Sequence, residues 1–73
     1  MDSAEELQKI HASGVLFTVH PCPDGFMVWL CNYRGDAEAA AMQPTFDQAV
    51  AWLREQVKFR YPDSDYAKRL LTN

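Results

Sequence analysis

The chain has 73 residues, of which 48% are hydrophobic and 12% aromatic, and it carries a formal net charge of −3. This apolar content argues against disorder. The length predicts one small domain over residues 1–73 with a marginal core, because so short a chain buries only about 60% of its unfolded surface. The acidic balance argues against a dedicated nucleic-acid binder, which would normally be basic.

The sequence also indicates a compartment. No apolar run is long enough to span a membrane. The first residues are acidic and no apolar core of a signal peptide follows them. With two cysteines and no secretion signal, we expect a reduced, cytoplasmic protein.

The first predicted helix begins at Ser3. The stretch from Ser3 to Glu6 fits a capping box, in which the two side chains satisfy backbone N–H groups that are open at a helix start. Leu7 and Ile10 lie on one stripe, and Gly14 is a natural stop. The helix has about three turns, too few to be stable alone, so it must dock on the rest of the chain.

A β-hairpin is predicted over residues 15–33. The segment Pro-Cys-Pro-Asp-Gly separates two apolar runs, VLFTVH and FMVWLCNY. In this segment Pro23 presets φ and Gly25 can adopt a positive φ, as a tight turn requires. Pro21 has no N–H to donate to a ladder, so we expect strand pairing to stop near His20.

Alternation of side chains gives the hairpin two faces. One face is fully apolar and is assigned to the core; it holds Val15, Phe17, Val19, Phe26, Val28 and Leu30. The other face would be polar if water covered it, yet it carries Leu16, Met27, Trp29, Cys31 and Tyr33. A register slip of one residue would exchange the two sets, and one apolar face would still remain outside the core. Such a face either marks an interaction site or is covered by a helix of the same chain.

The segment 37–42, Ala-Glu-Ala-Ala-Ala-Met, follows a turn at Arg34-Gly35-Asp36 and is ambiguous. Alanine favours a helix. The segment is short, however, and consecutive elements tend to be neighbours, which favours a third strand of a meander. We predict a short third strand, with a helix as the alternative.

The strongest helix signal covers residues 45–59. Thr45 and Gln48 form a capping box after Pro44. Helical spacing defines a core stripe of Phe46, Ala49, Val50, Leu53 and Val57. Trp52 and Phe59 are one heptad apart and lie off this stripe. They form a second apolar strip, which either lines the edge of the core or packs on the last helix, or contacts a partner.

A last short helix is predicted from Asp65 to Leu71. The preceding helix ends at Tyr61, because a residue before proline is disfavoured in the α region. Asp63 or Ser64 caps the new helix, and the residues expected to face inward are Tyr66, Ala67 and Leu70.

No residue pattern meets the requirements of a catalytic or metal site. Eight residues separate Cys22 from Cys31, a spacing that zinc-binding cysteine pairs do not show. A disulfide between them is not expected, since one lies in the turn and the other far down a strand. A cysteine nucleophile paired with His11 or His20 would need an orienting group and an oxyanion hole, and the neighbouring residues supply neither. The prediction is a protein that is not an enzyme and holds no cofactor and no metal.

The predicted order helix, strand, strand, strand, helix resembles that of double-stranded RNA-binding domains in topology. That family has lysines at the start of its last helix, and the corresponding stretch here, Pro44-Thr-Phe-Asp-Gln48, has none. The cations that could meet phosphates instead are Arg54, Lys58, Arg60, Lys68 and Arg69.

In build, the chain resembles small proteins encoded by bacteriophages and prophages, among them anti-CRISPR proteins and other host-takeover inhibitors. The resemblance covers size, acidity, the run Phe26-Met-Val-Trp-Leu30 after a Pro-Asp-Gly turn, and the capped helix with Ala49-Val-Ala-Trp-Leu53. It implies a stoichiometric binder of another protein, which would act in the host cytoplasm.

These observations together predict an α+β fold. An antiparallel hairpin or three-stranded meander packs against the helix at 45–59, with short N- and C-terminal helices. The predicted function is non-catalytic protein–protein interaction that inhibits or modulates a cellular machine, with contact residues Met27, Trp29, Tyr33, Trp52 and Phe59. One alternative is a homodimeric accessory protein whose sheets meet edge to edge or face to face. The other is a nucleic-acid-binding module.

Overall fold

The structure, a computed structural model, describes residues 2–72, with side chains described through residue 70. Within this range the elements follow the order α1 (Ser3–Ala12), β1 (Leu16–Cys22), β2 (Gly25–Cys31), β3 (Ala37–Gln43), α2 (Phe46–Arg60) and α3 (Asp65–Thr72). The strands form one antiparallel sheet in the order β1-β2-β3. The predicted α+β class is confirmed, and the ambiguous alanine-rich segment is a strand.

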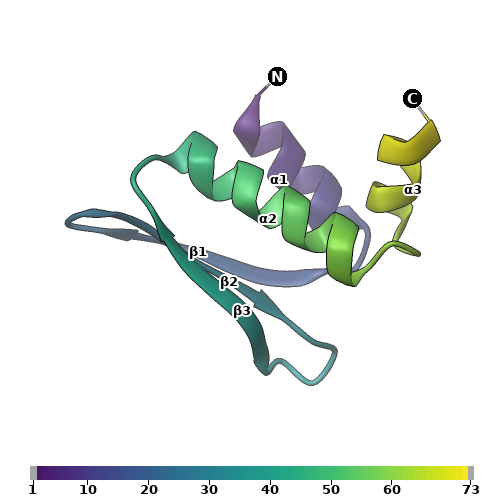
Figure 1. Cartoon of the computed structure of the whole chain (residues 1–73), viewed down its shortest axis with the longest axis horizontal. Coiled ribbons are helices and arrows are strands. Elements are labelled where there is room, and N and C mark those ends of the chain that lie inside the picture. The colour runs from purple at the N-terminus through teal and green to yellow at the C-terminus, as the bar shows by residue number, and fades with distance from the viewer. Residues whose placement is uncertain (1, 73) are drawn as a thin grey trace.

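The helices lie on one side of the sheet (Figure 1). Helix α2 packs on β2 and β3, and α1 lies beside α2. The largest fully buried side chains between the layers are Ile10, Val28, Leu30, Leu53 and Val57. The predicted core face of the hairpin is therefore the face that meets the helices, with Phe17, Val19 and Phe26 packed at its margin.

Strand β1 extends further than we predicted from the positions of its prolines. Pairing does not stop near His20, because Pro21 pairs with Phe26 and Cys22 with Gly25. Antiparallel pairs alternate between hydrogen-bonded and non-hydrogen-bonded positions. A proline without N–H fits a non-hydrogen-bonded position, so Pro21 costs the ladder nothing, and the turn shrinks to Pro23 and Asp24.

Helix α1 is capped by Asp2 and not, as predicted, by Ser3. The Asp2 side chain accepts a hydrogen bond from the Ala4 N–H at 3.0 Å. The Ser3 hydroxyl is then free to donate to Asp47 Oδ1 of α2 at 2.6 Å. The predicted cap of α2 is confirmed, since Thr45 Oγ1 accepts from the Gln48 N–H at 3.1 Å.

Helix α3 is attached to α1 by Tyr66. The Tyr66 backbone N–H donates to Ser13 Oγ at 2.9 Å, and its hydroxyl donates to Glu6 Oε2 at 3.2 Å. Both Tyr66 and Glu6 are buried. Burial, and then the Glu6 carboxylate, raise the pKa of Tyr66 to about 12.

We expect the Tyr66 phenol to make the protein sensitive to alkaline pH. Its pKa is about 10 in an unfolded chain and about 12 in the folded one. Its contribution is therefore complete below pH 10 and is lost as the pH rises from 10 to 12, because the unfolded state gives up the proton first. Urea unfolding between pH 8 and 12 measures this fall in the free energy of unfolding.

The variant Tyr66→Phe should show a smaller fall over the same pH range. At neutral pH it should also lose about 1.5–3 kcal/mol, because it removes a hydrogen bond to a buried carboxylate. A fall between pH 10 and 12 equal to that of the wild type would contradict this prediction. Part of the fall in the free energy of unfolding should remain in the variant, because the pKa of Tyr61 is also raised to about 12.

Candidate protein-binding surface

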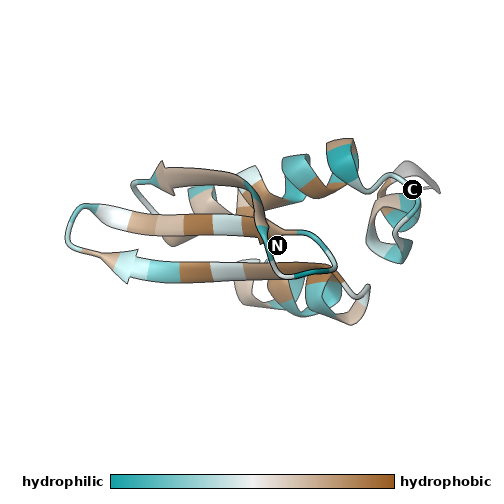
Figure 2. Ribbon diagram, turned by 90° about the horizontal axis from the view of Figure 1, so that it is seen from below, coloured by the Kyte–Doolittle hydropathy of each residue, from teal (hydrophilic) through white to brown (hydrophobic). Residues whose placement is uncertain are grey.

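The sheet has an open face, the side turned away from α1 and α2. Figure 2 looks at the molecule from this side and shows the three strands in front of the helices. The register places the outward side chains of the three strands together: Leu16, Thr18, His20, Met27, Trp29, Cys31, Ala40 and Met42. No helix of the described residues 2–72 covers them, so the alternative of a covering helix from this chain is wrong for that range.

Trp29 lies at the centre of the open face. It is on the middle strand, between Thr18 of β1 and Ala40 of β3. The His20 ring meets the indole edge to face, with ring centroids 5.7 Å apart. The small neighbours on both sides cannot cover so large a ring, and 40% of Trp29 is exposed.

Two further apolar side chains extend the exposed surface to the edge strands. Leu16 of β1 is 43% exposed and Met42 of β3 is 46% exposed, while Met27, directly opposite Met42 on β2, is partly buried. A contiguous apolar patch across three strands differs from the scattered exposed leucines of an ordinary surface. The open face is thus an unpartnered apolar layer.

The open face also lacks charged side chains. The three strands contain one Asp, Glu, Lys or Arg residue among them, Glu38, and the ladder is irregular beside it, at Leu30 and Cys31. Glu38 reaches the C-terminal end of α2, where Arg60 Nη1 lies 3.6 Å from its Oε2. The described strands therefore offer no Lys or Arg side chain to the phosphates of a nucleic acid.

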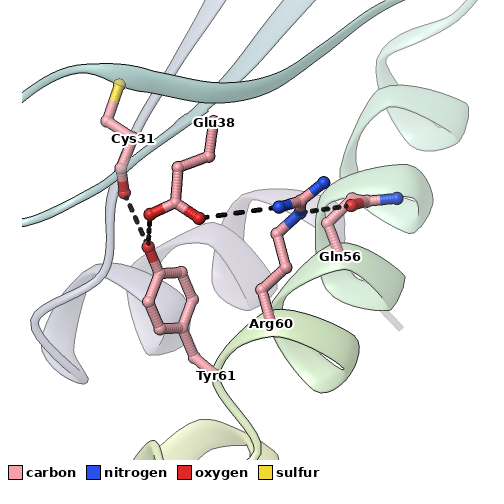
Figure 3. Close-up of polar contacts among 5 residues, drawn as sticks. All are labelled: Cys31, Glu38, Gln56, Arg60 and Tyr61. Carbon is pink, nitrogen blue, oxygen red and sulfur yellow. Dashed lines mark hydrogen bonds and ion pairs between the residues drawn. The ribbon is translucent and has the colours of Figure 1, made fainter.

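Tyr61 completes the contact between α2 and β3 (Figure 3). Its single O–H group donates a hydrogen bond that is shared between Glu38 Oε1 at 2.7 Å and the Cys31 carbonyl oxygen at 3.2 Å. Burial, followed by the hydrogen bond to the Glu38 carboxylate, raises the pKa of Tyr61 to about 12. These contacts hold the single strand carboxylate at the helix end and away from the open face.

The five predicted contact residues lie on different surfaces. Met27 and Trp29 are on the open face. Tyr33 is 87% exposed in the β2–β3 connection, and its ring meets Tyr61 edge to face at the end of the sheet. Trp52 and Phe59 are on α2, in the opposite layer, where Trp52 packs against the core and Phe59 is 79% exposed.

Met42 is the contact candidate that the sequence left out. It lies directly beside Met27 across the β2–β3 ladder. The prediction of a third strand contained the signal, because extending the alternation from Ala40 places Met42 on the same face as Trp29. Leu16 was assigned to this face but was not among the predicted contact residues.

Side chains of the metal-ligating types do not cluster in the described residues. Among residues 2–72 no three His, Cys, Asp or Glu side chains gather closely enough to hold a metal ion. Both cysteines are free thiols. A shallow pocket open to solvent lies at the sheet end and is lined by Ser13, Gly14, Val15, Leu16, Cys31, Tyr33 and Tyr61. None of the helices described is long and apolar enough to cross a membrane.

Function is therefore inferred from the open face and its surroundings. The face combines a central tryptophan, apolar flanks and an absence of charge, all on rigid strands. No protein-family model matches the sequence, and comparisons with curated proteins and with solved structures find no match.

Proposed function

We propose that the protein is a non-catalytic binding module whose open face docks on another protein and thereby inhibits or modulates it. The observation that supports this is the unpartnered, uncharged apolar face around Trp29, with Leu16 and Met42 exposed beside it. Tryptophan in a desolvated position is a frequent anchor of binding energy. Covering this face removes apolar surface from water at about 25 cal/mol per Å².

The size of the open face favours an amphipathic helix as the partner element. Three strands of seven residues give a face of about 23 by 14 Å. A helix with side chains is about 10 Å wide, so one helix with an apolar stripe fits along the strands. The other face of the same sheet already accepts helices in this manner, so a partner helix would complete a three-layer arrangement.

The pairing of the cations supports a protein partner over a nucleic acid. Lys58 Nζ lies 3.4 Å from Glu55 Oε2, and Arg60 contacts Glu38. Both cations are on α2 or at its end, in the layer opposite the open face. No group of phosphate-binding side chains therefore coincides with the apolar surface.

The test compares capture of partners by three forms of the full chain. The wild-type protein, Trp29→Ala and the control Tyr33→Ala are immobilised, and proteins from a lysate of the source cell are quantified. We expect Trp29→Ala to reduce specific capture at least about tenfold, as loss of a central anchor does. Tyr33→Ala removes an aromatic that is more exposed than Trp29, 87% against 40%, but lies at the sheet end outside the open face, and it should retain capture.

A second open-face variant separates binding from folding. Thr18→Lys adds a charge beside Trp29 without removing a buried side chain and should also abolish capture. Urea unfolding should show both open-face variants within about 1 kcal/mol of the wild type, because surface changes have small effects. Equal capture by the wild type and Trp29→Ala would refute the proposal.

A further inference from the structure

The two edges of the sheet differ in the backbone groups that they present. Pro21 has no N–H, so its pair with Phe26 is a non-hydrogen-bonded one, and the alternation continues across the sheet. Val28 is in a non-hydrogen-bonded pair with β1, so its N–H and C=O groups point toward β3, and Val28 and Ala41 form a hydrogen-bonded pair in the β2–β3 ladder. The N–H and C=O groups of Ala40 and Met42 therefore point away from β2, toward the outer edge of β3.

The two edges of the sheet are interrupted at different places. On β1, Pro21 occupies an outward position and interrupts the row of donors, which is a common way to block an edge. Strand β3 carries a charge at Glu38 and an irregular register beside it, both near its start, whereas its part from Ala39 to Gln43 contains neither proline nor a charged residue. Its alanines are small enough to let another strand approach closely, so β3 is the edge that can accept one.

The side of α2 above this edge carries exposed aromatic surface. Arg60 Nε donates to Gln56 Oε1 at 3.0 Å, and Arg60 also contacts Glu38, so the Gln56 side of α2 faces β3 (Figure 3). Trp52 is four residues before Gln56 and Phe59 three after it, which places both on this side of the helix. Helix α1 is attached on another side, through the Ser3–Asp47 hydrogen bond.

We infer that a second copy of this chain pairs its β3 with this β3, antiparallel, about a two-fold axis at Ala40. This register puts Glu38 of each copy opposite Met42 of the other, so no two carboxylates meet. It joins the two sheets into one of six strands. Because such an interface is isologous, the same residues serve both copies.

The α2 helices make the same pairing favourable in the second layer. The connection at Pro44 ties the start of α2 to the end of β3, and Arg60 ties its end to the start of β3. The middle of α2, at Trp52, therefore lies near the middle of β3, at Ala40. The two-fold axis brings the two α2 helices together antiparallel, and each Phe59 is covered by the helix of the other copy.

This dimer uses the edge of the sheet and leaves the open face free, so it goes beyond the proposed function and does not depend on it. Both open faces lie on the same side of the joined sheet. Their combined footprint is about twice that of one copy, or about 650 Å². That is closer to the roughly 800 Å² per partner of a stable protein interface.

The test measures the molar mass of the full chain by light scattering after size exclusion, over a wide concentration range. We expect a dimer for the wild type. Phe59→Asp, at a position already 79% exposed, should fold and raise the dimer dissociation constant about tenfold or more. Ala40→Pro should give a monomer, since it removes an outward N–H and none from the β2–β3 ladder. In the wild-type dimer the amide protons of Ala40 and Met42 should be protected from exchange.

Thr18→Lys is the matched control, because it changes the open face and leaves the edge intact. It should stay a dimer while losing partner capture. A wild-type chain that remains a monomer at all concentrations would overturn the inference. So would a dimer that Thr18→Lys separates and Phe59→Asp does not, because that result would place the interface on the open face. If Ala40→Pro fails to fold, Phe59→Asp decides.

Discussion

Replacing Gly25 with alanine is expected to remove about 3–5 kcal/mol from the free energy of unfolding. Gly25 has a φ of +145°, which side chains rarely adopt, and its added Cβ would overlap the backbone carbonyl oxygen of Gln43 and touch Pro44 Cα at 3.0 Å. Backbone strain and overpacking each cost about 1–3 kcal/mol. No side chain can rotate to relieve the overlap, because the atoms in contact belong to the backbone.

The matched control is Gly35→Ala, in the β2–β3 turn. Gly35 has a φ of +86°, but nothing lies within 4 Å of its added Cβ. This variant should lose only about 1–2 kcal/mol, the cost of the left-handed conformation. Thermal and urea unfolding of the two variants measure the difference. Equal losses would show that the close approach of Gly25 to the β3–α2 connection carries no energetic weight.

Replacing Leu53 with alanine is expected to cost about 3–5 kcal/mol. Leu53 is fully buried on α2 among Ile10, Val28, Leu30 and Val57. Truncating a buried leucine removes its transfer free energy and leaves a cavity between the helices and the sheet. A domain of this size has little stability in reserve, so a large fraction of the variant should be unfolded at physiological temperature.

Circular dichroism with a urea titration measures the effect of Leu53→Ala. Glu55→Ala, two residues away on the same helix, provides the comparison, because Glu55 is exposed and only forms a surface ion pair with Lys58. That variant should change the free energy of unfolding by less than about 1 kcal/mol. A loss of similar size in both variants would contradict the position of the core.

The secondary structure followed closely from local patterns. Alternation in residues 15–33 predicted both the strands and the core face, because only one of the two sets is free of polar side chains. The predicted stripe on α2 comprised Phe46, Ala49, Val50, Leu53 and Val57; the last four are buried, and Phe46 is partly buried. Residues 37–43 required topology, since alanine prefers a helix and only the ladder with β2 overrides that preference.

The two local errors have related causes. Pro21 was expected to end the ladder, but only the pairing register shows that its missing N–H points outward. Ser3 was expected to cap α1, but Asp2 is the cap and Ser3 bonds to Asp47, a residue 44 positions away. A local rule contains neither the pairing register that turns the Pro21 nitrogen outward nor the contact of Ser3 with a distant residue.

The sequence by itself determined which residues are apolar, where the cap of α2 falls, and that the hairpin has one apolar face more than a core needs. Only the tertiary structure decided which surfaces these residues form. It placed Met27 and Trp29 with Met42 on the open face, and Trp52 and Phe59 on α2, in the layer on the other side of the sheet. The reason is physical: periodicity assigns a residue to a face of its own element, whereas the packing of α1 and α2 on one side of the sheet assigns that face to the core or to a partner.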